Sequence, residues 1–350
     1  MLKKIRWQRT HKILLTSVVL SIVLSSFGFY AYQIMHAPNI LVGAKSDSSF
    51  YVYPRDDFRT IRIRLQEKNY IGDPVSFSFL ARILGWDKRI LVGHYQLQKN
   101  ASNLATLKKL HRGWQNPIRL TFNRVRKIEE LPNLFSSLLL NPQDLKQKLC
   151  SDKTAKQYGF NSENFLLMFI PNTYEFYWDV STQSFLDRMH NEYQRFWSNK
   201  RRKKADSLGL TPIEVGILAS IVQAETTKQE EMARVAGVYL NRLARGIFLS
   251  ADPTLVYAWD DFSIRRVLNR HKNIDSPYNT YRNPGLPPGP INSPEPYTLD
   301  AVLSAEKHKY LYFCAKHDFS GFHVFSRSLK EHMKHAKSYQ RSLNRARLFR

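Results

Sequence analysis

Glu225 is the residue whose position in this sequence most directly suggests chemistry. It follows Ile213, Ile217 and Ile221 at intervals of four residues, so the four side chains share one face of a helix. Burial among apolar side chains and the negative end of a helix both disfavour a charged carboxylate and raise its pKa. Glu225 is therefore either a surface charge where the helix ends or a general acid that protonates a leaving oxygen.

A second carboxylate would be needed by a glycosidase that works with a pair of acids. Asp252 is the nearest candidate in chain order, but the segment 250–254 is also typical of a turn opened by Asp-Pro. We expect Asp252 to form the turn or to contact a ligand rather than to act as a nucleophile.

Histidines gather near the C-terminus, but their spacing matches no zinc motif. His323 lies between Phe322 and Val324 and fits either a packed strand residue or a substrate contact. The sequence contains no H-E-x-x-H helix, P-loop, dinucleotide fingerprint or G-x-S-x-G motif, and its two cysteines form no CxxC pair. We expect neither a metal nor a cofactor. Unpaired buried thiols are favoured over a bridge between Cys150 and Cys314.

Local signals predict two consecutive helices around Glu225. Thr211, Pro212 and Glu214 form a capping box that opens the first helix. The segment 227–230 repeats this pattern, and the helix it opens places Met232, Val235, Ala236, Tyr239, Leu240 and Leu243 on one face. Glu225 would then lie at the junction of the two helices, on the core side of the first.

The rest of the chain predicts an α+β fold. Strands are expected at 50–53, 92–97 and 118–125 and as a hairpin at 310–313 and 322–325; helices are expected at 58–68, 103–111, 131–140, 142–149 and 329–348. Loops rich in Pro, Asn and aromatic residues cover 250–254, 277–281 and 285–291. The basic run 200–204 is expected to be a solvated linker.

The N-terminus predicts a membrane anchor. Residues 1–12 include five Lys or Arg residues. The segment Ile13–Met35 contains no charged residue and is long enough to span a bilayer as a helix. No Lys or Arg follows until Lys45, so the N-terminus is expected in the cytoplasm and the remainder outside. The alternative is a signal peptide, but the apolar run is long and no clear cleavage site follows.

The formal net charge of +24 requires an acidic partner. With the bulk of the 350-residue chain on the outer (periplasmic) side of the cytoplasmic membrane, nucleic acid is not expected, and an anionic polymer or anionic lipid fits better. We expect a cytoplasmic tail at 1–12, an anchor at 13–35, a small α+β region at 46–150 and a catalytic domain at 151–350.

Several motifs in fixed order resemble the bacterial YceG-like (MltG) family of endolytic murein transglycosylases. They are LASIVQAET, VAGVYLNRL, LSADPTLVYA, SPYNTYRNPGLPPGPI and YLYF, and the likeness covers about residues 155–345. The resemblance implies a LysM-like character for the region 46–150. It also aligns Glu225 with the family's catalytic acid, while Gln223 stands where many members carry a second Glu.

The resemblance implies cleavage of the bond between MurNAc and GlcNAc inside peptidoglycan strands, with Glu225 as the single acid and base and a 1,6-anhydro product. Peptidoglycan, inner-membrane lipid and proteins of the cell-wall synthesis machinery are the partners it implies. A hydrolytic muramidase and a non-catalytic wall-binding scaffold are the alternatives. The substrate groove is expected to include Asn241, Asp252, Tyr257, Tyr278, Asn279, Tyr281 and His323.

Overall fold

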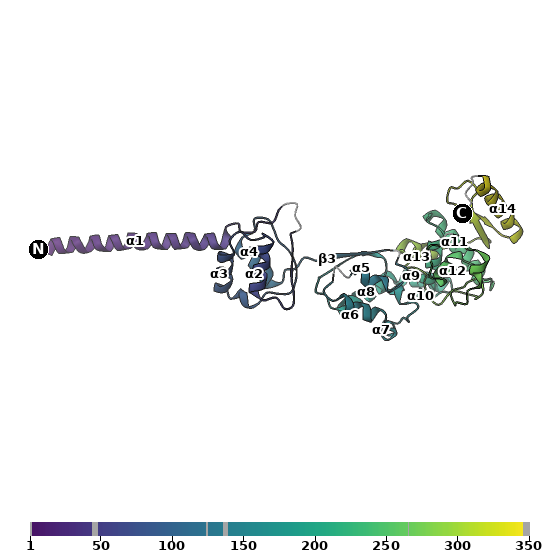
Figure 1. Cartoon of the computed structure of the whole chain (residues 1–350), viewed down its shortest axis with the longest axis horizontal. Helices are drawn as coiled ribbons and strands as arrows, with labels where there is room; N and C mark the ends of the chain where they lie inside the picture. The colour runs from purple at the N-terminus through teal and green to yellow at the C-terminus, as the bar shows by residue number, and fades with distance from the viewer. Residues whose placement is uncertain (1, 44–47, 124, 136–138, 265, 346–350) are drawn as a thin grey trace. The chain divides into compact units, whose positions relative to one another are not determined.

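A long apolar helix opens the chain. In the computed structural model, which describes residues 2–43, 48–123, 125–135, 139–264 and 266–345, helix α1 covers Leu2–His36 (Figure 1). Its part His11–His36 has no buried side chains and is long and apolar enough to cross a membrane. At 1.5 Å per residue it is about 39 Å long, against about 30 Å of hydrocarbon in a bilayer. The predicted apolar span 13–35 lies inside it.

The chain folds into two compact units. Unit 1 comprises Met1–Ile118 and Glu175–Asp179, and unit 2 comprises Arg119–Tyr174 and Val180–Arg350. The units separate near residue 118, whereas the functional domains are predicted to separate near residue 150. The assignment of roles to the domains stays a prediction.

Unit 1 is a small α+β body, as the sequence predicts. Strand β1 (Ser49–Val52) pairs antiparallel with β2 (Gly93–Gln96), with Phe50 opposite Tyr95. Its helices are α2 (Phe58–Glu67), α3 (Pro74–Ile83) and α4 (Asn103–Arg112), with a 3-10 turn η1 at Trp86–Lys88. A core of aliphatic and aromatic residues fills the space between these helices and the paired strands β1 and β2. Helix α3 was not predicted.

The first part of unit 2 contains most of a second small sheet. Strand β3 (Ile118–Phe122) pairs with β4 (Asn172–Phe176), and buried Phe122 stacks on Tyr174. The accompanying helices are α5 (Glu130–Phe135), α6 (Pro142–Leu149), α7 (Asp152–Gln157), η2 (Phe165–Met168), α8 (Thr182–Phe196) and α9 (Asn199–Ser207).

The second part of unit 2 is built around one buried helix. Helix α10 (Pro212–Glu225) packs against α11 (Gln229–Leu243), α12 (Asp252–Ala258) and α13 (Pro296–Val302). The predicted hairpin is β5 (Tyr312–Ala315) paired with β6 (His323–Ser326), on which α14 (Leu329–Arg345) packs. The 3-10 turn η3 covers Asn269–Asn273.

Four local predictions are wrong. The run 200–204 is not a linker but part of α9, where Arg201 forms an ion pair with Asp300. The turn expected at 250–254 begins helix α12 instead. The capping box expected at 227–230 does not open α11, whose N-cap is Lys228 with no side-chain cap bond, and Thr226 accepts from the Lys228 amide. Both cysteines are free, as expected, but Cys150 is exposed and Cys314 is only half-buried.

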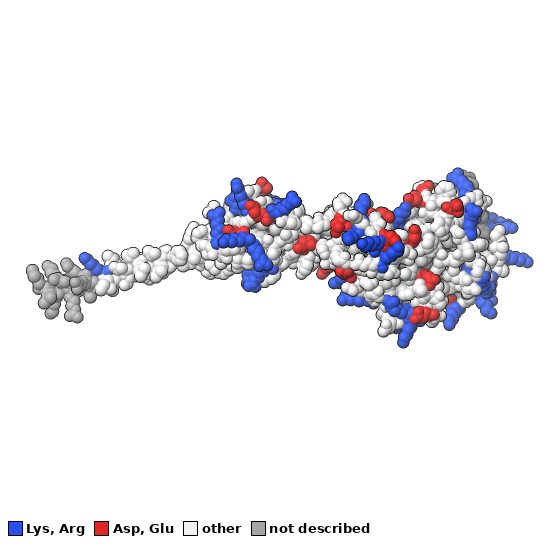
Figure 2. Space-filling model, turned by 90° about the horizontal axis from the view of Figure 1, so that it is seen from below, with Lys and Arg blue, Asp and Glu red and all other residues white. Residues whose placement is uncertain are grey.

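Two predicted helix ends fall partly or wholly on residues that the structure does not describe. Helix α5 ends at Phe135, and residues 136–138 of the predicted helix 131–140 lie outside the described residues. Helix α14 ends at Arg345, and the predicted residues 346–348 also lie outside them. Lys and Arg are spread over the surfaces of both units on the face that Figure 2 shows.

Candidate active site

Helix α10 delivers Glu225 to the site. Its first turn is closed by a capping box, in which the Glu214 amide donates to Thr211 and the Glu214 carboxylate accepts from the Thr211 amide. Every residue from Val215 to Val222 is buried, so protein covers all sides of this helix. Glu225 is the last residue of α10, which confirms its predicted place at the junction with α11.

The Glu225 carboxyl is partly exposed at one side and held by a tyrosine at the other. Tyr239 of α11, itself buried, donates its hydroxyl to Glu225 Oε1 at 2.7 Å. Burial is the largest cause that raises the pKa of Glu225, to about 7, and the negative charge of Asp252 raises this pKa further. The hydrogen bond from Tyr239 and the positive charge of Arg242 act in the opposite direction and lower the pKa. A Glu with this pKa holds its proton near neutral pH and can still release it.

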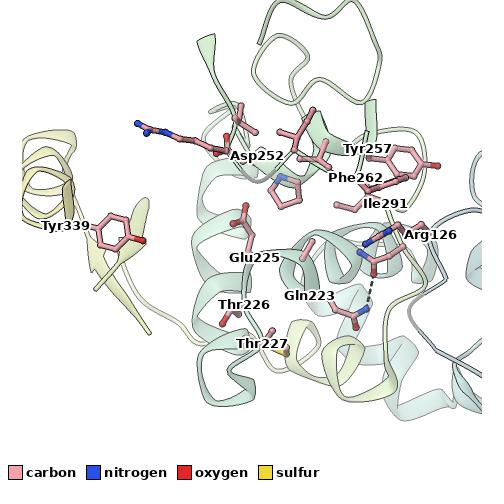
Figure 3. A pocket seen from close by; sticks show the side chains of 18 of the residues that line it. Arg126, Gln223, Glu225, Thr226, Thr227, Asp252, Tyr257, Phe262, Ile291 and Tyr339 are labelled. Carbon is pink, nitrogen blue, oxygen red and sulfur yellow. Dashed lines mark hydrogen bonds between the residues drawn. The ribbon is translucent and has the colours of Figure 1, made fainter. Parts of the chain in front are cut away.

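Glu225 faces a cavity of about 860 Å³, which lies within the range typical of ligand sites. Figure 3 shows its carboxyl group pointing toward the side of the cavity on which Asp252 lies. The carboxylates among the lining residues are Glu225 and Asp252, and the cations are Arg126 and Arg266. The other walls are mixed polar and apolar: Gln223, Thr226, Thr227, Val256, Tyr257, Phe262, Ile291, Asn292, Tyr297, Tyr339 and Gln340.

Gln223 is a structural member of the cavity wall. Its amide nitrogen donates to Asn292 Oδ1 at 2.9 Å and to the Ser293 carbonyl at 3.2 Å. Its amide oxygen accepts from the Glu295 amide at 2.7 Å and from the Thr298 hydroxyl at 3.1 Å. An amide has no acidic proton to transfer. The donors and acceptors of the Gln223 amide all bind the segment 292–298 and so hold that segment against α10.

Asp252 lies at the first position of α12 and lines the cavity beside Glu225. Tyr281 donates its hydroxyl to Asp252 Oδ1 at 2.5 Å. Behind them, the buried hydroxyls of Thr254 and Thr280 lie 2.9 Å apart and join α12 to the loop that carries Tyr281. The structure thus brings Asp252 and Tyr281 together at the site, with Tyr281 in a supporting position.

Tyr257 also lines the cavity, and its ring lies 4.7 Å from that of Tyr278. Tyr278 is buried outside the lining and donates its hydroxyl to Glu163 Oε2 at 2.8 Å. Asn279 is fully buried, and its side-chain amide donates to the carbonyls of Lys272 and Ile274. Tyr278 and Asn279 therefore shape the wall from behind.

The remaining two predicted groove residues lie away from the cavity lining. Asn241 donates to the carbonyls of His308 at 2.8 Å and Tyr310 at 3.0 Å, and so holds the segment before β5. His323 is paired with buried Glu231, whose carboxylate accepts from the His323 amide at 2.9 Å and lies 3.0 Å from Nδ1. His323 was interpreted either as a packed strand residue or as a substrate contact. Its contacts with Glu231 fit the packed strand residue.

Several site residues escaped prediction. Tyr239 was placed correctly on the buried face of its helix, but nothing in the sequence shows that its hydroxyl meets Glu225. Arg126 and Phe262, whose guanidinium and ring lie 4.3 Å apart, come from segments far from α10 in sequence and carry no local signal. Among the described residues, no group of three His, Cys, Asp or Glu side chains could hold a metal ion.

The fold and site define a class: an α+β protein with an N-terminal apolar helix and a cavity built around one protonatable glutamate. The chain belongs to the YceG-like family, whose model matches residues 50–338. A 2.6 Å crystal structure of a yceG-like protein from Listeria monocytogenes is similar at a TM-score of 0.55 and 25% identity, covering 83% of this chain and 99% of that one.

Two relatives carry the name endolytic murein transglycosylase. The one from Bacillus subtilis (strain 168) is 42% identical over 127 residues, which are 36% of this chain and 34% of that protein. The one from Streptococcus pneumoniae serotype 2 (strain D39) is 25% identical over 338 residues, covering 84% of this chain and 59% of that protein. The matched regions span less than two thirds of the length of either relative.

Proposed function

We propose that this chain is a membrane-anchored lytic transglycosylase that cleaves peptidoglycan within its glycan strands. The observation that carries the proposal is the Glu225 carboxyl, which faces a cavity of suitable size with a pKa raised to about 7. The name endolytic murein transglycosylase, which the two relatives described above carry, supports the same substrate.

In the proposed reaction Glu225 is the only proton carrier. Tyr239 occupies Oε1, so Oε2 carries the proton that passes to the oxygen between MurNAc and GlcNAc. The bond from that oxygen to the MurNAc anomeric carbon breaks, and GlcNAc leaves with a hydroxyl. The MurNAc C6 hydroxyl oxygen bonds to the anomeric carbon and returns its proton to Glu225. No water is consumed, and the attacking group is already part of the substrate, which gives it a high effective concentration.

Asp252 and Tyr257 are the predicted ligand residues that line the cavity, and we assign them direct contact with the glycan. Tyr278, Asn279 and Tyr281 support the walls from behind, whereas Asn241 and His323 hold neighbouring segments outside the cavity lining. A tyrosine ring at such a wall suits the apolar face of a sugar, and the wall arginines Arg126 and Arg266 suit the carboxylates of peptidoglycan peptides.

Helix α1 would anchor the chain in the cytoplasmic membrane. The basic residues before it and the absence of Lys or Arg between Ile13 and Gly43 favour an N-terminus in the cytoplasm, with the chain after α1 on the outer side of the membrane. Unit 1 would be the LysM-like region of the family pattern, which follows the anchor in the sequence. Proteins of the cell-wall synthesis machinery are the protein partners we expect.

The hydrolytic alternative differs in the attacking group, because a water would replace the C6 hydroxyl and Asp252 could direct it or act as the nucleophile. The scaffold alternative removes the chemistry altogether. The hydrolase would release fragments with ordinary reducing ends, and the scaffold would release none.

Purified sacculi digested with the full chain in detergent test the proposal by mass spectrometry of the released fragments. We expect 1,6-anhydroMurNAc ends, and a loss of about a thousandfold or more for Glu225→Gln with unchanged binding to sacculi. Reducing ends without anhydro rings would establish the hydrolase, and an unchanged yield for Glu225→Gln would reject Glu225 as the acid. Thr227→Val, which alters a residue of the cavity rim, is the matched control and should keep most activity.

A further inference from the structure

Helix α3 of unit 1 carries apolar side chains on two opposite faces. One face, with Phe77, Leu80 and Ala81, is buried in the core of unit 1. The other face carries Val75, Phe79 and Ile83, whose side chains are 74%, 51% and 65% exposed. We call these three residues the α3 stripe.

The α3 stripe is a continuous surface. Its residues are spaced by four, so they lie one above another along the helix. A helix of a soluble domain normally turns polar residues to water, and one that is apolar on all sides is normally buried in protein or in lipid. A contiguous exposed apolar patch of this kind marks a surface that meets another apolar phase.

Helix α3 packs beside the end of the apolar helix α1 (Figure 1). Asn103 of α4 joins the two: its side-chain amide donates to the Ile34 carbonyl of α1 at 2.9 Å and to the Ser76 hydroxyl of α3 at 3.0 Å. Ile34 and Met35 of α1 also pack against the core of unit 1. The α3 stripe therefore lies in the same unit as, and next to, the point where α1 would leave a membrane.

Basic and aromatic residues lie at the same end of unit 1. His36, Lys108, Lys109 and Trp114 line a shared cavity of about 590 Å³ beside the end of α1. The ring of Trp114 is half exposed, with the Lys108 ammonium 5.6 Å from it. Trp rings and basic side chains of this kind are typical of the headgroup level of a bilayer.

We propose that the α3 stripe is seated in the outer leaflet of the membrane that α1 spans, so that unit 1 lies on the membrane surface. This inference rests on the anchoring role proposed for α1. Lipid is the occupant we assign because a spanning α1 brings the bilayer surface to its own last turn, and α3 packs against that turn. This contact with lipid would cover the exposed apolar face of α3. It would also fix the depth of unit 1 in the membrane surface, as a second attachment besides the anchor α1.

Spin labels in the full chain reconstituted into vesicles of phosphatidylethanolamine and phosphatidylglycerol test the seat. Single cysteines replace Val75, Phe79 or Ile83 in a background carrying Cys150→Ser and Cys314→Ser, and the accessibility of each label to oxygen and to a water-soluble nickel chelate is measured. The matched control is Ile63→Cys on α2, also an exposed apolar residue, and Ile22→Cys reports on α1 itself.

We expect the ratio of oxygen to nickel accessibility to be several-fold higher at the stripe than at residue 63, and highest at residue 22. A deep label at residue 22 with aqueous labels at the stripe would overturn the seat and leave the anchor standing. An aqueous label at residue 22 would reject the anchor itself. Stripe labels shielded from both reagents, with disulfide-linked dimers of the unlabelled cysteine variants, would assign the surface to a second copy and overturn the lipid seat.

Discussion

Helices α3 and α10 are both apolar around most of their circumference, yet they meet different surroundings. Protein covers α10 on every side between Val215 and Val222, and its last residue is Glu225. Protein covers α3 on one side, and the opposite side, with Val75, Phe79 and Ile83, faces outward. The same composition therefore supports two tasks: in unit 2 it keeps an acid partly dry, and in unit 1 it leaves a surface for lipid.

The two helices also show that apolar side chains can contribute to the stability of the fold, to the function of the protein, or to both. In α10 the apolar side chains stabilise the fold and at the same time set the electrostatic environment of the carboxyl group that follows them. In α3 the exposed side chains contribute little to the fold, because they contact water in the isolated chain. Variants that affect one property and spare the other can test this distinction.

A pair of identical substitutions gives the largest expected contrast. Val215→Ser in α10 removes methyl groups from a fully buried site and adds a hydroxyl there, and we expect it to lower the free energy of unfolding by about 3 kcal/mol. Val75→Ser in α3 changes a residue that is 74% exposed, and we expect a change within about 0.5 kcal/mol.

Urea unfolding of the detergent-solubilised chain, followed by tryptophan fluorescence, measures this contrast. The transition of unit 2 should move to lower urea for Val215→Ser, and neither transition should move for Val75→Ser. Equal shifts for the two variants would mean that the stripe of α3 is covered by protein in the folded chain.

The burial of Glu225 has a cost in stability that depends on pH. Its pKa is about 7 in the folded chain against an ordinary 4.5, so between these values the unfolded chain loses a proton that the folded chain keeps. Stability is therefore unaffected below about pH 4.5, falls as the pH rises to about 7 and stays low above it. Glu225→Gln should match the wild type at pH 4 and be more stable by about 2 kcal/mol at pH 8.

Calorimetric unfolding of the two proteins at both pH values tests this difference. Thr227→Val, which leaves Glu225 in place, is the control and should follow the wild type at each pH. A Glu225→Gln protein with no gain at pH 8 would show that water reaches the carboxyl freely.

The hydrogen bond from Tyr239 gives the next effect. It stabilises the charged carboxylate, so Tyr239→Phe should raise the pKa of Glu225 and move the loss of activity to higher pH. The same variant frees Oε1 from its fixed position, and we expect kcat to fall about tenfold. The rate of anhydro-end formation as a function of pH measures both the pKa of Glu225 and kcat. A lower rate with an unchanged pH dependence would mean that Tyr239 contributes by packing and not through the pKa of Glu225.

Local chemistry made much of unit 2 predictable. The capping box at Thr211, the turn from α10 to α11 and the hairpin of β5 and β6 each depend on neighbouring residues, and the sequence carries those signals directly. The position of Glu225 followed from the same periodicity. Helix α3 was not predicted, because apolar residues on two opposite faces give no single helical stripe to recognise.

Interactions between distant segments could not be predicted in this way. The bond from Tyr239 to Glu225 depends on how α11 crosses α10, and the place of Arg126 in the cavity depends on a segment about 100 residues earlier. Asn241 and His323 looked like groove residues because polar side chains beside apolar ones fit either role. Their partners, the His308 and Tyr310 carbonyls and Glu231, become visible only in three dimensions.

Asp252 gives the smallest expected effect and separates the two catalytic schemes. As a neighbouring charge it raises the pKa of Glu225, so Asp252→Asn should lower that pKa and move the loss of activity to lower pH. If Asp252 only contacts the glycan, kcat should fall less than about tenfold and anhydro ends should still form. If Asp252 were a nucleophile, the same variant would lose activity by about as much as Glu225→Gln. Asparagine keeps an oxygen that can accept from Tyr281, so the rate, the pH limb and the product ends report on charge rather than on a displaced loop.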